Sequence, residues 1–118
     1  MISVKTDIMN LTENVCRACE GGVEPLTREQ VKPLLEQLHD AWTLSQDGRT
    51  IVRHMTFADF KELMAFVNQV ADLAESEGHH PDLDTRYNKL TIALTTHAIG
   101  GLSENDFILA AKIDTLGG

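Results

Sequence analysis

Apolar residues recur at helical spacing in some stretches of this chain and at alternate positions in others, and the two patterns predict its elements. The first helical stretch begins after Thr27, which has Gln30 three residues later in the pattern of a capping box. Pro33 lies within it, so the helix is expected either to kink there or to begin in earnest near that residue. Its apolar face consists of Val31, Leu34, Leu35 and Leu38.

The longest helical stretch runs from Phe57 to Glu77. Thr56 is the predicted N-cap, and Asp59 in the first turn complements the helix dipole. Gly78 suits the left-handed conformation that often follows the last turn of a helix, so the helix is expected to end there. Its apolar face consists of Phe60, Leu63, Met64, Val67, Val70, Ala71 and Ala74.

A hairpin is predicted between these two helices. Short β-prone runs at residues 42–44 and 50–56 flank Asp47-Gly48, and this dipeptide is a strong signal for a tight turn. His54 lies in the second run, and we interpret it as a solvated or half-buried strand residue without a chemical role.

A second hairpin follows the long helix. Its two runs, at residues 83–87 and 90–96, alternate apolar and polar residues and are expected to join at Asn88-Lys89. Tyr87 is interpreted as a packing residue whose hydroxyl finds a partner. His97 continues the parity of the more polar face, so it is expected to leave the strand end opposite the apolar face.

The last helix is predicted to begin after the cap Ser103 and to direct Phe107, Ile108, Ala111 and Leu116 toward the core. The order is therefore helix, hairpin, helix, hairpin, helix. This order favours an α+β fold, a two-layer sandwich in which a four-stranded antiparallel sheet carries helices on one face. Residues 25–118 are expected to form this single domain, after a partly ordered N-terminal arm at residues 1–24.

Composition narrows the classes of function. The 118 residues are 42% hydrophobic, which favours one folded domain, and the net charge of −8 argues against binding nucleic acid or an anionic membrane. No apolar run is long enough to span a membrane and no secretory signal is recognisable, so a cytoplasmic location is expected. Cys16 and Cys19 form a single Cys-x-x-Cys, which we interpret as a reduced, partly ordered pair, with zinc or redox chemistry as the alternative.

The candidate chemistry is concentrated between Glu75 and Asp106. Three of the five histidines fall in this stretch: His79, His80 and His97. Imidazole is the side chain that exchanges protons near neutral pH, so this clustering points to proton transfer or metal binding. The adjacent pair follows a helix end, whose partial negative charge favours the protonated form of both rings.

Two carboxylates and a proline complete the candidate set. Glu75 lies one helical turn before His79 and is expected to orient or charge that ring. Asp106 is expected to cap the last helix, to orient a histidine, or to do both. Pro81 is expected to fix the turn and to favour an extended backbone at His80.

Two types of chemistry fit this set of residues. In the first, three histidines and their carboxylates move protons on a small organic substrate. In the second, His79, His80 and His97 bind a metal ion together with one carboxylate. Side chains of adjacent residues diverge, and histidine ligand pairs on helices are usually four residues apart, so metal-free acid–base chemistry is favoured.

Seven positions of this stretch resemble the signature of the pterin-4a-carbinolamine dehydratase family: Glu75-x3-His79-His80-Pro81-x5-Tyr87-x9-His97-x8-Asp106. The similarity extends over about residues 25–114. It implies a four-stranded antiparallel sheet with helices on one side, in chains that form dimers or tetramers. It also implies dehydration of 4a-hydroxytetrahydrobiopterin to quinonoid dihydropterin, without a metal or an organic cofactor.

The same resemblance implies roles for the candidate residues. His79 and His97 would act as general acids that protonate the departing 4a-hydroxyl group. His80 would bind the pterin and help to remove the N5 proton. Glu75 and Asp106 would orient the rings or contact the pterin. Loss of water needs an acid at the oxygen and a base at the nitrogen, which agrees with the acid–base chemistry inferred from the residues themselves.

The resemblance leaves the biological setting open. It implies recycling of the pterin cofactor after aromatic amino-acid hydroxylation, with phenylalanine hydroxylase as a functional partner. A role in molybdopterin metabolism is an alternative. Another is a non-catalytic dimerisation or regulatory partner, since the animal member also serves as a dimerisation cofactor for a liver homeodomain transcription factor. Leu83 stands where animal members carry an aromatic residue, which concerns the pocket wall rather than the proton chemistry.

Overall fold

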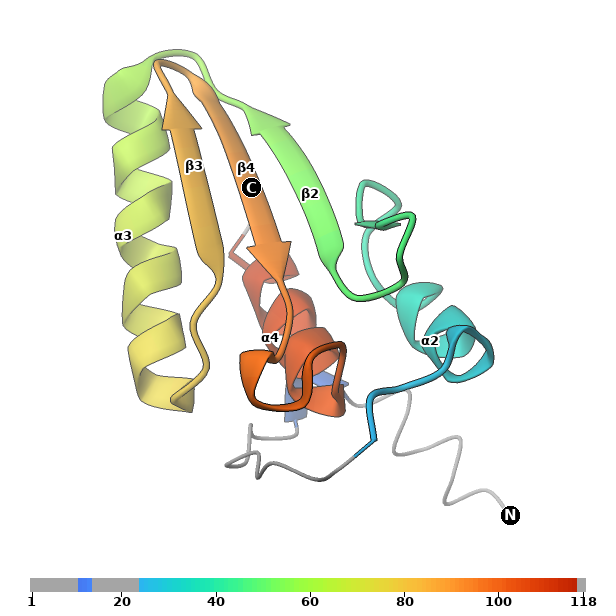
Figure 1. Ribbon diagram of the computed structural model, residues 1–118. Coiled ribbons are helices and arrows are strands. Elements are labelled where there is room, and N and C mark those ends of the chain that lie inside the picture. Colours follow the sequence, from blue (N-terminus) through green and yellow to red (C-terminus); the bar gives the residue numbers. More distant parts are fainter. Residues whose placement is uncertain (1–10, 14–23, 117–118) are drawn as a thin grey trace.

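The computed structural model describes residues 11–13 and 24–116. Most of the expected N-terminal arm, including Cys16 and Cys19, therefore lies outside the described residues. The elements follow the expected order, with two short 3₁₀ helices (η) added (Figure 1). Their bounds are η1 Leu11–Glu13, α2 Arg28–Leu35, β1 Thr43–Leu44, β2 Ile51–Thr56, α3 Phe60–Glu77, β3 Asp82–Arg86, β4 Lys89–Leu94, η2 His97–Ile99 and α4 Glu104–Asp114.

The strands of the described residues form one antiparallel sheet of four strands in the order β1-β2-β4-β3. The β2–β4 pairing joins the two hairpins, with Ile51 opposite Leu94 and Met55 opposite Leu90. These four side chains are buried, whereas alternate residues such as His54 are exposed. Figure 1 shows α3 alongside β3, at the left of the view, and α4 behind β4. The predicted α+β sandwich with helices on one face is confirmed.

Helix α2 begins at Arg28, where the predicted capping box of Thr27 and Gln30 is present. The helix continues through Pro33 to Leu35, so the alternative that it begins near the proline is wrong. Pro33 is the sixth residue of this helix and has no amide hydrogen, so the helix lacks the hydrogen bond that this position would donate to the Glu29 carbonyl.

The beginning of α3 differs from the prediction. The N-cap is Asp59, whose carboxylate accepts a hydrogen bond from the Glu62 amide at 2.9 Å. Thr56 is still in β2, where it pairs with Lys89, so it cannot also start a helix. Gly78 ends the helix in the left-handed conformation, as predicted. On the apolar face, Leu63, Phe66, Val70 and Ala74 are buried, whereas Phe60 and Ala71 are exposed.

The turn between β3 and β4 is also displaced from the prediction. It is made by Tyr87 and Asn88 rather than Asn88 and Lys89, because Arg86 and Lys89 already pair across the hairpin. Tyr87 has a positive φ of 53° and a side chain that is 67% exposed, so its interpretation as a packing residue is wrong. Asn88 holds the turn against the end of β2 through two hydrogen bonds with the Phe57 backbone.

Helix α4 begins after Ser103, as predicted, and is the most buried helix of the described residues. Phe107, Ile108 and Ala111 face the core, as expected. Leu11 of η1 packs into the same core. No helix within residues 11–13 and 24–116 is both long and apolar enough to cross a membrane.

Candidate active site

The three candidate histidines line one cavity of about 250 Å³. His79 and His80 follow the C-terminus of α3, and His97 opens η2, just after β4. The remaining lining residues are Gly78, Thr95, Thr96 and Ala98. Segments that are 17 residues apart in sequence therefore meet at this end of the sheet, as the clustering of histidines predicted.

The end of α3 directs the histidine pair into the cavity. Gly78 adopts a φ of 69°, and its amide and that of His79 both bond to the Ala74 carbonyl. This left-handed residue stops the helix and reverses the chain, which a residue with a Cβ would do only with strain. Pro81 is half-buried directly before β3, which begins at Asp82.

His79 is held by a buried carboxylate. Its Nε2 lies 2.6 Å from Oδ1 of Asp106, which is 0% exposed, and the His79 side chain is only 13% exposed. The other oxygen, Oδ2, accepts hydrogen bonds from Thr96 Oγ1 at 2.7 Å and from the Ser103 amide at 2.9 Å. Ser103 is the N-cap of α4, so Asp106 caps this helix and orients a histidine at the same time.

His80 is held by an exposed carboxylate instead. Its Nε2 lies 2.7 Å from Oε2 of Glu75, and the two side chains are 61% and 78% exposed. Glu75 was expected to pair with His79, and this is wrong because the buried Asp106 carboxylate takes that ring. Solvent screens the exposed pair, so it restrains its ring less than the buried pair does.

His97 has a different environment. It is the first residue of η2 rather than the last of a strand, because β4 ends at Leu94 and Thr96 pairs with Gly101. The residue is exposed, and its ring makes no hydrogen bond or ion pair with any described residue. A free ring beside the cavity is able to reach a bound molecule and to exchange protons with solvent.

The second acidic residue near the end of α3 has a partner as well. Glu77 Oε2 lies 2.5 Å from the ammonium group of Lys112, and both side chains are largely buried. This ion pair ties the last turn of α3 to α4, the helix that carries Asp106.

The described residues contain no group of three or more histidine, cysteine, aspartate or glutamate side chains arranged to hold a metal ion. His79 and His80 each direct Nε2 at a different carboxylate, so their rings diverge as expected for adjacent residues. Tyr87 does not line the cavity; β3 separates it from the histidine pair.

Thr96 is a site residue that sequence reasoning missed. It is buried, and its hydroxyl contacts both Asp106 and Ser103. A signal was present in the sequence, because Thr96 shares the parity of Leu90, Ile92 and Leu94. A hydroxyl on the core side of a strand needs a buried partner, and here that partner is a carboxylate.

Comparison with known proteins gives one consistent result. The family model described as pterin 4 alpha carbinolamine dehydratase matches residues 24–116. A protein of Nitrosomonas eutropha, provisionally named a pterin-4-alpha-carbinolamine dehydratase, is 50% identical over 111 residues, which cover 94% of this chain and 96% of that protein. A Legionella pneumophila protein with the same provisional name is 48% identical over 107 residues, covering 91% and 95%.

Solved structures extend the likeness to the fold. The crystal structure of a transcriptional coactivator/pterin dehydratase from Brucella melitensis has a TM-score of 0.75 at 32% identity, and the match covers 80% of this chain and 100% of that one. A pterin dehydratase-like protein identified as a RuBisCO assembly factor in the alpha-carboxysome has a TM-score of 0.58 at 25% identity, covering 68% and 93%. Sequence, fold and matched length agree, and this chain belongs to the pterin-4a-carbinolamine dehydratase family.

Proposed function

We propose that this protein is a hydro-lyase that dehydrates 4a-hydroxytetrahydrobiopterin, the pterin-4a-carbinolamine, to quinonoid dihydropterin. Family membership supports the reaction class. The observation that carries the proposal is the cavity itself, where three imidazoles meet and one of them is hydrogen-bonded to a fully buried carboxylate.

The reaction requires two proton transfers. A general acid protonates the 4a-hydroxyl group, the C4a–O bond breaks and water leaves. The electron pair on N5 forms the new C4a=N5 double bond, and a general base removes the N5 proton. One proton is taken up and one is released, so no oxidant or reductant is needed. Imidazole serves as acid or base near neutral pH, and positioned side chains of this kind contribute about 10²–10⁴-fold each.

The environments of the rings suggest how the roles divide. The Asp106 carboxylate bonds to Nε2 of His79, which fixes the ring and leaves Nδ1 as the nitrogen for exchange with substrate. His97, free and exposed at the cavity edge, suits the second general acid. His80, restrained only by the solvent-screened Glu75, suits pterin binding and removal of the N5 proton. Pro81 directly follows His80 and restricts its backbone, which would limit the positions open to that ring.

The test is turnover of chemically generated 4a-hydroxytetrahydropterin, followed through the absorbance of the quinonoid product. His79→Gln and His97→Gln are each expected to lower kcat about 10²-fold or more, and His80→Gln to raise KM as well. His39→Gln is the matched control, because His39 is exposed between α2 and β1, its ring accepts a hydrogen bond from the Ala41 amide and it does not line the cavity. Wild-type protein without turnover, or equal losses in all four variants, would overturn the proposal.

We also propose that the protein is a homo-oligomer. The sheet face opposite the helices carries Val52, Thr91 and Ala93, which are only half-buried in the isolated chain. Light scattering on the purified chain tests this, and a monomeric mass at micromolar concentration would refute it.

The biological setting is proposed as recycling of the pterin cofactor of phenylalanine hydroxylase in the cytoplasm. A coupled assay tests it: the protein should prevent accumulation of 4a-hydroxypterin during hydroxylation, and His79→Gln should not. A purely regulatory role is the alternative, and it would be favoured by an inactive wild type that nevertheless captures a protein partner.

A further inference from the structure

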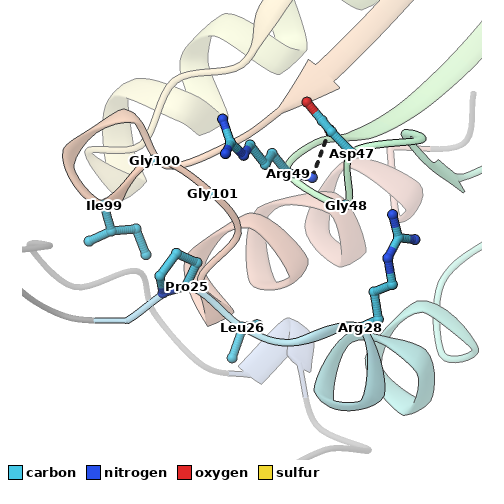
Figure 2. Close-up of a pocket in the computed structure, with 9 residues that line it drawn as sticks. All are labelled: Pro25, Leu26, Arg28, Asp47, Gly48, Arg49, Ile99, Gly100 and Gly101. Carbon is cyan, nitrogen blue, oxygen red and sulfur yellow. Dashed lines mark hydrogen bonds between the residues drawn. The ribbon is translucent and has the colours of Figure 1, made fainter.

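A second cavity of about 510 Å³ adjoins the histidine site. The two cavities share one loop, since residues 95–98 line the histidine cavity and residues 99–101 line the second. Figure 2 shows Pro25, Leu26 and Ile99 gathered on one side of it. The turn between β1 and β2 forms the other side, and Arg28 and Arg49 bring positive charge to the lining.

The charge of this cavity contrasts with that of the chain. The protein has 10 lysine and arginine residues against 18 acidic ones, and two of the arginines line this one cavity. Within the described residues, the Arg49 guanidinium makes no hydrogen bond and no ion pair within 4.0 Å. A cation left without a close partner on a strongly acidic protein is available to an anionic ligand.

Asp47 also lines the cavity, but its carboxylate forms hydrogen bonds within its own turn. It accepts hydrogen bonds from Ser45 Oγ at 2.6 Å and from the Arg49 amide at 3.0 Å. The Ser45 hydrogen bond is the main reason why the pKa of Asp47 lies below its ordinary value, with the Arg49 amide and charge acting in the same direction. The carboxylate therefore stabilises the turn that presents Arg49.

The second arginine is positioned by the same turn. Arg28 donates a hydrogen bond to the Gln46 carbonyl, and its guanidinium lies against Gly48. Gly48 has a φ of +74°, and a Cβ placed there would come within 3.4 Å of the Arg28 guanidinium carbon. The positive φ of Gly48 thus gives the turn its conformation, and the Arg28 guanidinium is held against this turn before any ligand arrives.

We propose that this cavity binds a phosphate ester. A guanidinium group offers a planar fork of donors that matches two phosphate oxygens. Arg49 offers this fork without a close partner among the described residues, and Arg28, on the other side of Gly48, adds to the positive charge that attracts a phosphate dianion. The apolar side chains of Pro25, Leu26 and Ile99 would contact the organic part of the ester.

The shared loop connects this site with the proposed reaction. Thr95, which lines the histidine cavity, donates a hydrogen bond from Oγ1 to the Arg49 carbonyl at 2.6 Å. Residues 97–99 form a single turn of 3₁₀ helix, roughly 6 Å long, whose first two residues line the histidine cavity and whose last residue lines the second cavity. Two sources of the ester fit this placement. The first is a phosphorylated side chain of the pterin substrate itself, and this alternative rests on the proposed function. The second is a separate phosphorylated molecule.

Binding is tested first with inorganic phosphate as the probe, by calorimetry or ³¹P NMR at constant ionic strength. Arg49→Gln removes the uncommitted cation and is expected to weaken binding roughly five- to tenfold. Arg28→Gln tests the second cation. Arg86→Gln is the matched control, because it removes the same charge from the exposed end of β3, which lines neither cavity, and should leave binding unchanged. No binding by the wild type, or an equal loss in the control, overturns the proposal.

The source of the ester is tested by turnover of two 4a-hydroxypterins, one with a neutral and one with a phosphorylated side chain. If the substrate supplies the phosphate, Arg49→Gln raises KM for the phosphorylated pterin only, and inorganic phosphate competes with that substrate alone. If phosphate binds but changes neither KM value, the ligand is a separate molecule. Failure of the dehydratase proposal would appear as absent turnover, while the phosphate titration would still decide the cavity's ligand.

Discussion

The substitution Thr96→Val tests whether the buried hydroxyl network positions the candidate catalytic histidine. Valine keeps the shape of threonine but cannot donate to Oδ2 of Asp106, 2.7 Å away. Thr96 is 4% exposed and Asp106 is 0% exposed, so water does not readily replace the lost donor. The carboxylate keeps the Ser103 amide and His79 as partners. A buried hydrogen bond to a charged group contributes about 1.5–3 kcal/mol, so we expect a loss of about 2 kcal/mol in the free energy of unfolding.

The effect on catalysis is expected to be separate from the effect on stability. With one of three restraints gone, the Asp106 carboxylate turns more freely and His79 follows it through their 2.6 Å contact. Misplacement of a catalytic group by about 1 Å costs up to 10²-fold, so kcat should fall about tenfold or more while KM changes little. The assays are urea denaturation and steady-state turnover well below the unfolding midpoint.

Thr85→Val provides the control in the same sheet. Thr85 is exposed on β3 and lines neither cavity. This variant should lose less than about 0.5 kcal/mol of stability and keep its kcat. If Thr96→Val loses stability as expected but turns over at the wild-type rate, the network is structural only, and Thr96 does not position His79.

Three further predictions concern stability. Asp114→Ala is expected to cost about 3 kcal/mol in urea denaturation, because it leaves the buried Arg53 guanidinium without its carboxylate partner; a loss below about 1 kcal/mol would contradict this. Gly78→Ala should cost about 1 kcal/mol of thermal stability through its positive φ alone, since nothing lies within 4 Å of the added methyl group; an unchanged Tm would refute it. Because the Ser45 hydrogen bond lowers the pKa of Asp47 from 3.8, its ionised carboxylate stabilises the fold above that value, and this contribution disappears as pH falls through the lowered pKa. The stability difference between wild type and Asp47→Asn should therefore narrow on acid titration below 3.8, and a constant difference would contradict the assignment.

Local sequence signals correctly predicted the features of the fold that depend on residues close together in the chain. The capping pair Thr27 and Gln30 and the left-handed Gly78 depend on neighbouring residues, and all of them are where the sequence placed them. Thr56 was misassigned because nothing nearby shows that it pairs with Lys89, a residue 33 positions later. Sheet register overrides local propensity in this way, and a single sequence does not contain the register explicitly.

The same distinction applies to the candidate site. That His79, His80 and His97 belong together was predictable from their clustering and from the family signature. Which carboxylate meets which ring was not, because His79 follows a chain reversal and its partner comes from α4. The alternation along β4 placed Thr96 on the core side, and a polar residue there was the available sign of the network that holds Asp106.

The two histidine–carboxylate pairs join the same kinds of chemical group and differ physically in burial. Glu75 and His80 meet in solvent, where Coulomb attraction is weak and both side chains exchange partners readily. Asp106 and His79 meet where water is excluded, and three donors, from His79, Thr96 and Ser103, converge on the carboxylate. The His79 ring is therefore fixed in one orientation, whereas the exposed His80 ring is free to move with a ligand. Burial rather than sequence spacing thus separates the fixed ring from the mobile one.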